Sequence, residues 1–188
     1  MDLKKLLFSK NYTEEEQEMF DFLRENILFR ELTNKELSFI VPVIHERKFK
    51  MDEVVFFRQD PSQAVYILKE GKVKLYMSIN DNEEDLIELT EGYIFGQNGL
   101  IEGGKRNYNA LVTEDKTVLF VIPQVAILEV FKKHPQLESK IYKQLAKYYN
   151  DFIGTVFTKY RDNYGLFELN QIYDHAYIRK IKSLHHVE

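Results

Sequence analysis

The sequence predicts a mainly β fold with flanking helices, in which the central part of the chain forms a sandwich or jelly-roll barrel. Two observations support this fold class. Between about residues 45 and 122, β-branched and aromatic residues recur with a period of two, and turn residues separate the runs. Before and after this region, apolar residues recur at helical spacing. No helix-length crossover separates the short runs, which argues against a parallel α/β sheet.

Two helices are expected before the strands. In residues 12–27, Thr13 is a suitable N-cap, three glutamates follow it, and apolar residues repeat on one face. A second helix is expected to start at Thr33, because Thr33 and Glu36 have the spacing of a capping box. Pro42 is expected to end or kink this helix.

Six strands are expected in the central region, over residues 54–57, 64–68, 73–79, 85–89, 108–112 and 117–122. Turn-forming residues lie between them, at Gly71, at residues 80–82, at Gly92 and at residues 114–116. Several short strands with regular turns are typical of a two-sheet β architecture.

The pattern returns to helical spacing after Pro123, which suits a first helical position. His134 and Pro135 end that helix, and a long helix is expected over residues 135–161. The apolar and aromatic stripe on the long helix is wider than packing on one face requires, which favours homodimerisation through this helix. A further helix is expected over residues 164–182.

The composition limits the possible functions. Of the 188 residues, 44% are hydrophobic and 30% are charged, which is typical of a globular protein, and no apolar run approaches a membrane span. The chain has no cysteine, which excludes disulfides, cysteine nucleophiles and thiolate metal sites. A net charge of −4 argues against a dedicated nucleic-acid surface. These features point to a cytoplasmic protein.

No constellation for catalysis or metal binding stands out in the sequence. The five histidines are too scattered for the histidine and carboxylate set of a barrel metal centre. No serine lies in a nucleophile-elbow context. We therefore expect neither a metal site nor an enzyme.

Glycines are concentrated in one segment. Five of the eight glycines lie within residues 92–104, and Arg106 follows. Such a segment can point several amide N–H groups at an anion that an arginine then neutralises. The alternative is a long hairpin loop with basic residues on its surface.

The ordered set of residues 28–32, 57–61, 65–68, 70–76 and 89–96 carries a family resemblance. From about Ile27 to Tyr149 the chain resembles the cyclic-nucleotide-binding domain, the β-roll of catabolite-activator-type regulators and protein kinase A regulatory subunits. The resemblance implies a double-stranded β-helix (jelly roll or β-roll) with N-terminal helices and a long C-terminal helix. It divides the chain into an N-terminal helical extension (1–26), the β-roll (27–134) and the long helix with its tail (135–188).

The resemblance also implies a ligand site. Arg106, ten residues after Gly96, stands where the family keeps its phosphate-binding arginine. Gln97 stands where the family has a glutamate that holds the ribose. The expected site consists of Gly96, Gln97, Asn98, Gly99, Arg106 and Asn107, with the amides of Asn98, Gly99 and Asn107 as donors. Tyr108 and Asn109 are larger than the residues that the family places there.

The expected function is that of a non-enzymatic sensor that needs no cofactor and binds cAMP, cGMP or a similar small phosphate. Direct nucleic-acid binding is not expected, because the residues after Arg161 are too few for the winged helix of the transcription factors in the family. Two alternatives stay open. One is a protein-interaction module with a degenerate pocket, filled by side chains such as Tyr108 or Asn109. The other is a relative of the transcriptional regulators that lacks its own DNA-binding domain.

Overall fold

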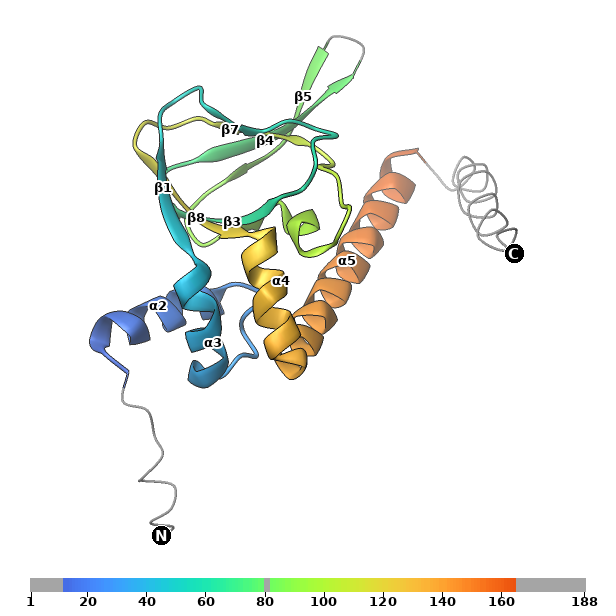
Figure 1. The fold of residues 1–188 in the computed structure, drawn as a ribbon. Coiled ribbons are helices and arrows are strands. Elements are labelled where there is room, and N and C mark those ends of the chain that lie inside the picture. The colour runs from blue at the N-terminus through green and yellow to red at the C-terminus, as the bar shows by residue number, and fades with distance from the viewer. Residues whose placement is uncertain (1–11, 80–81, 165–188) are drawn as a thin grey trace, which may run out of the picture. The chain divides into compact units, whose positions relative to one another are not determined.

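The computed structural model describes residues 12–79 and 82–164 (Figure 1). Helices α2 (Glu14–Glu25) and α3 (Asn34–Ile40) and the 3-10 turn η1 (Val41–Val43) come first. The strands are β1 (His45–Phe49), β2 (Val54–Phe56), β3 (Ala64–Glu70), β4 (Val73–Ile79), β5 (Asn82–Leu89), β6 (Ile94–Phe95), β7 (Asn109–Val112) and β8 (Thr117–Pro123). The 3-10 turn η2 (Gln97–Leu100) follows β6, and helices α4 (Gln124–Lys133) and α5 (Pro135–Tyr164) follow β8.

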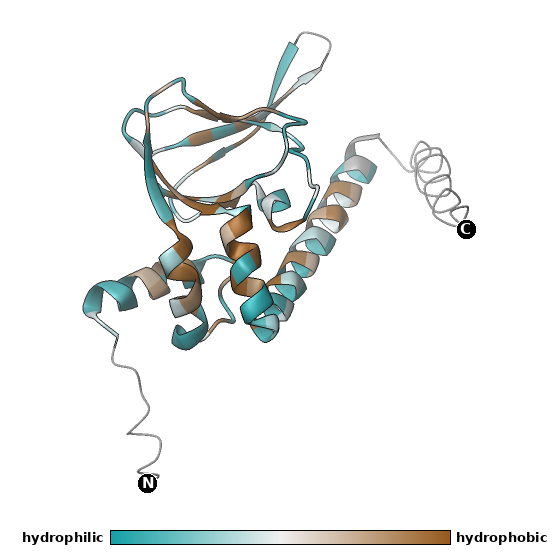
Figure 2. Cartoon of the chain, in the orientation of Figure 1, coloured by the Kyte–Doolittle hydropathy of each residue, from teal (hydrophilic) through white to brown (hydrophobic). Residues whose placement is uncertain are grey.

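The strands form two antiparallel four-stranded sheets, in the orders β1-β8-β3-β6 and β2-β7-β4-β5. Apolar side chains from both sheets, including those of Leu68, Val73 and Leu119, form one buried cluster. Figure 2 shows hydrophobic residues along the strands of both sheets. The expected β-roll with flanking helices is therefore confirmed, and helices α2, α3 and α4 group beside the roll (Figure 1).

The two N-terminal helices begin as their sequences predict. Thr13 caps α2 and Thr33 caps α3, each in a capping box with the glutamate three residues later. Helix α3 ends at Ile40, and Pro42 lies in η1. Glu36 of the second capping box also forms a 2.8 Å ion pair with Lys140 of α5, which joins the two helices.

Several boundaries differ from the sequence prediction. Strand β1 is missing from the prediction because four of its five residues are exposed, so its sequence lacks the alternation of a half-buried strand. Strand β6 has only two residues, which is too short to give a pattern. Strand β5 begins at Asn82 rather than 85 and pairs with β4 along its length. Pro123 ends β8 and occupies the N-cap of α4 rather than its first helical position.

The described residues up to Leu145 belong to one compact unit, and those from Ala146 to a second. Helix α5 runs through both and, as expected, begins directly after His134. Among the described residues of the second unit, the exposed large apolar side chains lie on α5 and are Phe152, Ile153, Val156 and Phe157. The helix expected over 164–182 falls, after Tyr164, outside the described residues. The domain limits at 26/27 and 134/135 stay a prediction.

Candidate functional site

The glycine-rich segment forms a short turn against β3. Gly96 precedes η2 with a φ of 69°, a left-handed conformation that favours glycine. A Cβ at Gly96 would lie 2.5 Å from the Nη1 atom of Arg106, so any other residue here would displace the guanidinium.

Arg106 points inward and ties this loop to the sheet. The residue is only 2% exposed. Its Nη1 donates to the carbonyl oxygen of Gly96 at 2.9 Å, and its Nη2 donates to the carbonyl oxygen of Ala64 in β3 at 2.8 Å. The guanidinium therefore bridges the turn before η2 and the start of β3.

Aromatic rings surround the guanidinium. Its central carbon lies 4.1 Å from the ring centroid of Phe56 and 5.4 Å from that of Tyr66, distances at which a cation is attracted to the ring face. The ring of Phe56 also packs against Phe95 and Tyr108, at 6.0 and 5.8 Å between centroids. The cation is thus held between carbonyl oxygens and aromatic faces.

The charge of Arg106 lacks a carboxylate partner within 4 Å among residues 12–79 and 82–164. Burial lowers the pKa of the guanidinium, while Tyr66, Tyr108 and the exposed Asp60 act in the opposite direction. Arginine stays charged even so. In the same described part of the chain, its Nε is buried without a hydrogen-bond partner. The site therefore contains a positive charge and a donor that an anion would complement.

Tyr108 and Gln97 bond to the same turn. The Gly96 N–H donates to the hydroxyl of Tyr108 at 3.0 Å, and that hydroxyl lies 3.5 Å from Oε1 of Gln97. The Nε2 of the buried Gln97 donates to the Ile94 carbonyl at 3.1 Å. A glutamate has no N–H to donate there, so the structure gives a local reason for glutamine at position 97.

The structure brings most of the predicted site residues together. Gly96, Gln97, Asn98 and Gly99 are consecutive in the turn, and Arg106 is bonded to the first of them. The Gly99 N–H, expected as a free donor, instead donates to the Gly96 carbonyl at 2.9 Å. Asn107 is exposed and follows Arg106 directly. A ligand role for these residues stays a prediction.

Sequence reasoning missed the aromatic walls of this site. Phe56, Tyr66 and Phe95 come from three different strands, and only the pairing of those strands brings the rings together. Asn109, expected as an oversized pocket residue, accepts the Arg58 N–H on its Oδ1 at 2.8 Å. Its side chain therefore fixes the turn after β2.

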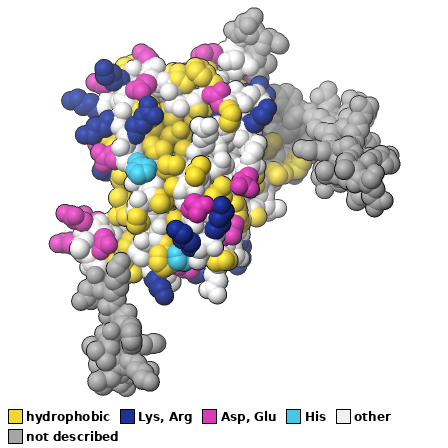
Figure 3. All heavy atoms as spheres, viewed as in Figure 1, with side chains coloured by type: hydrophobic (Ala, Val, Ile, Leu, Met, Phe, Trp, Pro, Cys, Tyr) yellow, Lys and Arg dark blue, Asp and Glu magenta, His cyan; other side chains and the backbone are white. Residues whose placement is uncertain are grey.

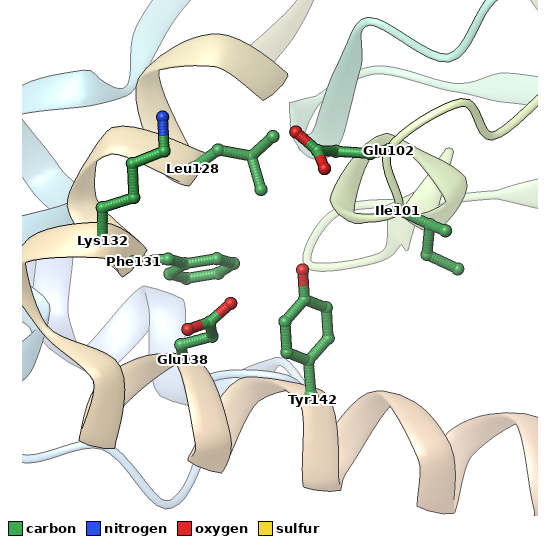
Figure 4. Close-up of a pocket in the computed structure, with 7 residues that line it drawn as sticks. All are labelled: Ile101, Glu102, Leu128, Phe131, Lys132, Glu138 and Tyr142. Carbon is green, nitrogen blue, oxygen red and sulfur yellow. The ribbon is translucent and has the colours of Figure 1, made fainter.

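A cavity of about 310 Å³ lies apart from these residues, where the chain after η2 meets α4 and α5. Ile101, Glu102, Leu128, Phe131, Lys132, Glu138 and Tyr142 line it. Figure 4 shows the Tyr142 hydroxyl and the Glu138 carboxylate pointing into the space between the three segments. The Tyr142 hydroxyl donates to the Leu100 carbonyl at 2.8 Å, which links α5 to η2.

Other kinds of site find little support in the described ranges. No group of three or more histidine, aspartate or glutamate side chains there is arranged to hold a metal ion. None of the helices in that part of the chain is both long and apolar enough to cross a membrane. On the face in view in Figure 3, lysines and arginines are interspersed with aspartates and glutamates.

Comparisons with known proteins agree with this architecture. The Cyclic AMP receptor protein of Thermus thermophilus is 26% identical over 121 residues, which cover 64% of this chain and 56% of that protein. The cAMP-dependent protein kinase regulatory subunit of Candida albicans is 24% identical over 142 residues, covering 76% of this chain and 28% of that protein. The chain thus spans little more than half of the first relative and about a quarter of the second.

A solved structure and a family model complete the comparison. The N-terminal domain of a transcriptional regulator from Streptomyces coelicolor matches with a TM-score of 0.63 at 20% identity, over 70% of this chain and 94% of that one. This similarity shows the shared fold. The family model described as "Cyclic nucleotide-binding domain" matches residues 46–134. These residues, slightly less than half of the chain, thus match the cyclic nucleotide-binding domain family.

Proposed function

We propose that this chain is a non-enzymatic regulatory module that binds a cyclic nucleotide, cAMP or cGMP, or a similar small phosphate, at Arg106. The match of residues 46–134 to the family supports the regulatory role. The observation that carries the proposal is the buried guanidinium of Arg106, which makes no ion pair with any described residue and has an unpartnered Nε.

Burying the charge of Arg106 costs free energy. A charged group removed from water is strongly disfavoured unless it is paired and hydrogen-bonded. Two carbonyl oxygens and two aromatic faces compensate Arg106 in part, but each carries only a partial charge. A phosphate oxygen would supply the full negative charge and an acceptor for Nε, and charge-assisted bonds of this kind are strong.

The other predicted residues have supporting roles in this proposal. Oε1 of Gln97 accepts from a ribose hydroxyl, as the family resemblance implies. The amides of Asn98 and Asn107 donate to the phosphate. Gly99 lets the turn lie close to β3, because a Cβ there would lie 2.3 Å from the Ala64 carbonyl oxygen. The same oxygen also accepts from Arg106.

Calorimetric titration of the full chain with cAMP and with cGMP tests the proposal. We expect saturable binding that Arg106→Lys weakens by about tenfold or more, since lysine loses a bidentate charge-assisted contact. Arg58→Lys is the matched control, because it makes the same chemical change at an exposed arginine. Circular dichroism checks that each variant is folded.

A thermal-shift measurement on the unmodified chain keeps the test independent of any variant. A ligand that binds only the folded state raises the melting temperature. The absence of both a binding heat and a thermal shift with millimolar cAMP, cGMP and inorganic phosphate would contradict the proposal.

A second candidate function is a protein-interaction module whose pocket the chain fills itself. The hydroxyl of Tyr108 on the Gly96 N–H favours it, because a side chain already uses a donor in the turn. This candidate predicts no binding of any small phosphate by the unmodified chain. The same titration therefore separates the two.

We also propose that the chain forms a homodimer through α5 and acts in the cytoplasm. The exposed apolar residues Phe152, Ile153, Val156 and Phe157 support the dimer. The cysteine-free sequence suits a reducing compartment.

A further inference from the structure

We infer that Tyr108 sets the affinity and specificity of the Arg106 site by acting as an internal occupant that a nucleotide has to displace. This inference rests on the proposed function, because it concerns the same site. The match to the family does not by itself assign this role to Tyr108.

The geometry around Gly96 is the first argument. The Gly96 carbonyl accepts from Nη1 of Arg106 at 2.9 Å, and the Gly96 N–H donates to the hydroxyl of Tyr108 at 3.0 Å. Two side chains that are two residues apart thus satisfy both polar backbone groups of one glycine. Tyr108 and Arg106 therefore meet at the same residue of the turn.

Shared packing is the second argument. The ring of Phe56 lies 4.1 Å from the guanidinium carbon of Arg106 and 5.8 Å from the ring centroid of Tyr108. Tyr108 is partly buried. The ring of Phe56 therefore packs against both the Tyr108 ring and the guanidinium that the anion is proposed to bind.

An incoming ligand has to displace the Tyr108 hydroxyl from the Gly96 amide. The Tyr108 hydroxyl is a neutral acceptor on an amide that a charged phosphate oxygen would bind more strongly. An inorganic phosphate needs only the hydroxyl to move. A nucleotide carries a sugar and a base as well, so it needs the space of the whole ring. Tyr108 should therefore penalise nucleotides more than inorganic phosphate.

The test compares Tyr108→Phe and Tyr108→Ala with the unmodified full chain, by calorimetry with cAMP, cGMP and inorganic phosphate. Removing one neutral acceptor with Tyr108→Phe is expected to tighten all three by about two- to tenfold. Tyr108→Ala also removes the ring. We expect it to tighten the binding of cAMP or cGMP by about tenfold or more relative to the binding of inorganic phosphate. Tyr93→Ala is the matched control, because Tyr93 is 52% exposed in the segment before β6.

Each result separates the inference from the proposed function. If the unmodified chain binds cAMP and both Tyr108 variants bind it equally well, the inference is wrong and the proposed function holds. If only the variants bind, Tyr108 is the occupant and the unmodified chain is not a nucleotide sensor. If no protein binds any of the three ligands while Tyr108→Phe melts as a folded protein, both are wrong. Should Tyr108→Ala fail to fold, the Tyr108→Phe arm decides alone.

Discussion

The guanidinium carbon of Arg106 lies 4.1 Å from the ring centroid of Phe56, and both side chains are buried. Phe56 comes from β2, whereas Arg106 lies in the segment before β7, the strand with which β2 pairs. The pairing of these two strands therefore creates the contact. A cation on an aromatic face in a desolvated place is worth more than the same contact in water.

Phe56→Leu tests that contact. We expect the free energy of unfolding to fall by about 2 kcal/mol or more, because the substitution removes a desolvated cation–π contact together with part of a core side chain. Urea unfolding followed by circular dichroism measures it. Phe57→Leu makes the same change at the next residue, which is 54% exposed, and should stay within about 0.5 kcal/mol of the parent chain. Equal losses for both variants would contradict the assignment.

Gly96→Ala and Gly103→Ala separate backbone strain from crowding. Both glycines have a φ of 69°, but a Cβ at Gly96 meets Arg106 at 2.5 Å while a Cβ at Gly103 meets nothing within 4 Å. We expect about 1–2 kcal/mol of destabilisation from the left-handed conformation in both variants. Gly96→Ala should lose clearly more, since the guanidinium has to move. The midpoints of urea unfolding give the comparison.

Gln97→Glu places a carboxylate where the Nε2 group now donates to the Ile94 carbonyl. The hydrogen bond from position 97 to the Ile94 carbonyl is lost, and a carboxylate oxygen then faces that carbonyl oxygen in a buried place. The expected loss is about 1–3 kcal/mol at neutral pH, measured by urea unfolding. Gln63→Glu is the control because its residue is exposed. A Gln97→Glu chain as stable as the parent would show that the Ile94 contact is unimportant.

The pair of Glu36 and Lys140 gives a pH dependence. Burial raises the pKa of Glu36, but the hydrogen bonds from Lys140 and Thr33 together outweigh it, and the pKa lies below its ordinary value of 4.5. The folded state thus favours the charged carboxylate. Its contribution to stability is present above about pH 4.5 and is lost as the pH falls through the lower folded pKa.

Glu36→Gln measures this contribution, because glutamine keeps the capping geometry without the charge. We expect the variant to be less stable by about 0.5–1 kcal/mol at pH 7, since the pair is partly exposed, and the difference to shrink in acid. A double-mutant cycle with Lys140→Met isolates the pair. A coupling energy that does not change between pH 7 and acid would contradict the ionic origin.

Val156 and Val125 form a matched pair for the dimer. Both are exposed valines on helices, but Val156 lies among the exposed apolar residues of α5, whereas Val125 lies at the start of α4. We expect the parent chain and Val125→Glu to have the mass of two chains in light scattering, and Val156→Glu to shift toward the mass of one. A parent chain with the mass of a single chain at high concentration would contradict the dimer.

Local patterns predicted much of the fold. The N-cap at Thr13, the capping box at Thr33 and the break at His134 depend only on residues within four positions, so they can be recognised in the sequence. Strands β3, β4 and β8 alternate or are uniformly apolar because a sheet covers them. Strand β1 shows four exposed residues in a row, and its place in the sheet depends on β8, far along the chain.

The site was less predictable than the fold. Spacing and resemblance located Arg106, but arginine is rarely fully buried, and its bonds to Gly96 and Ala64 depend on how the turn packs on β3. The hydroxyl of Tyr108 on the Gly96 amide depends on a side-chain direction that periodicity does not give. The aromatic walls require the pairing of strands that are distant in sequence.

The bonds around Gln97 have an evolutionary consequence. Glutamine at position 97 donates to the Ile94 carbonyl and lies next to the Tyr108 hydroxyl, whereas a glutamate would leave the Ile94 carbonyl without that donor. Substitutions at positions 97 and 108 should therefore be inherited together across descendants of a common ancestor.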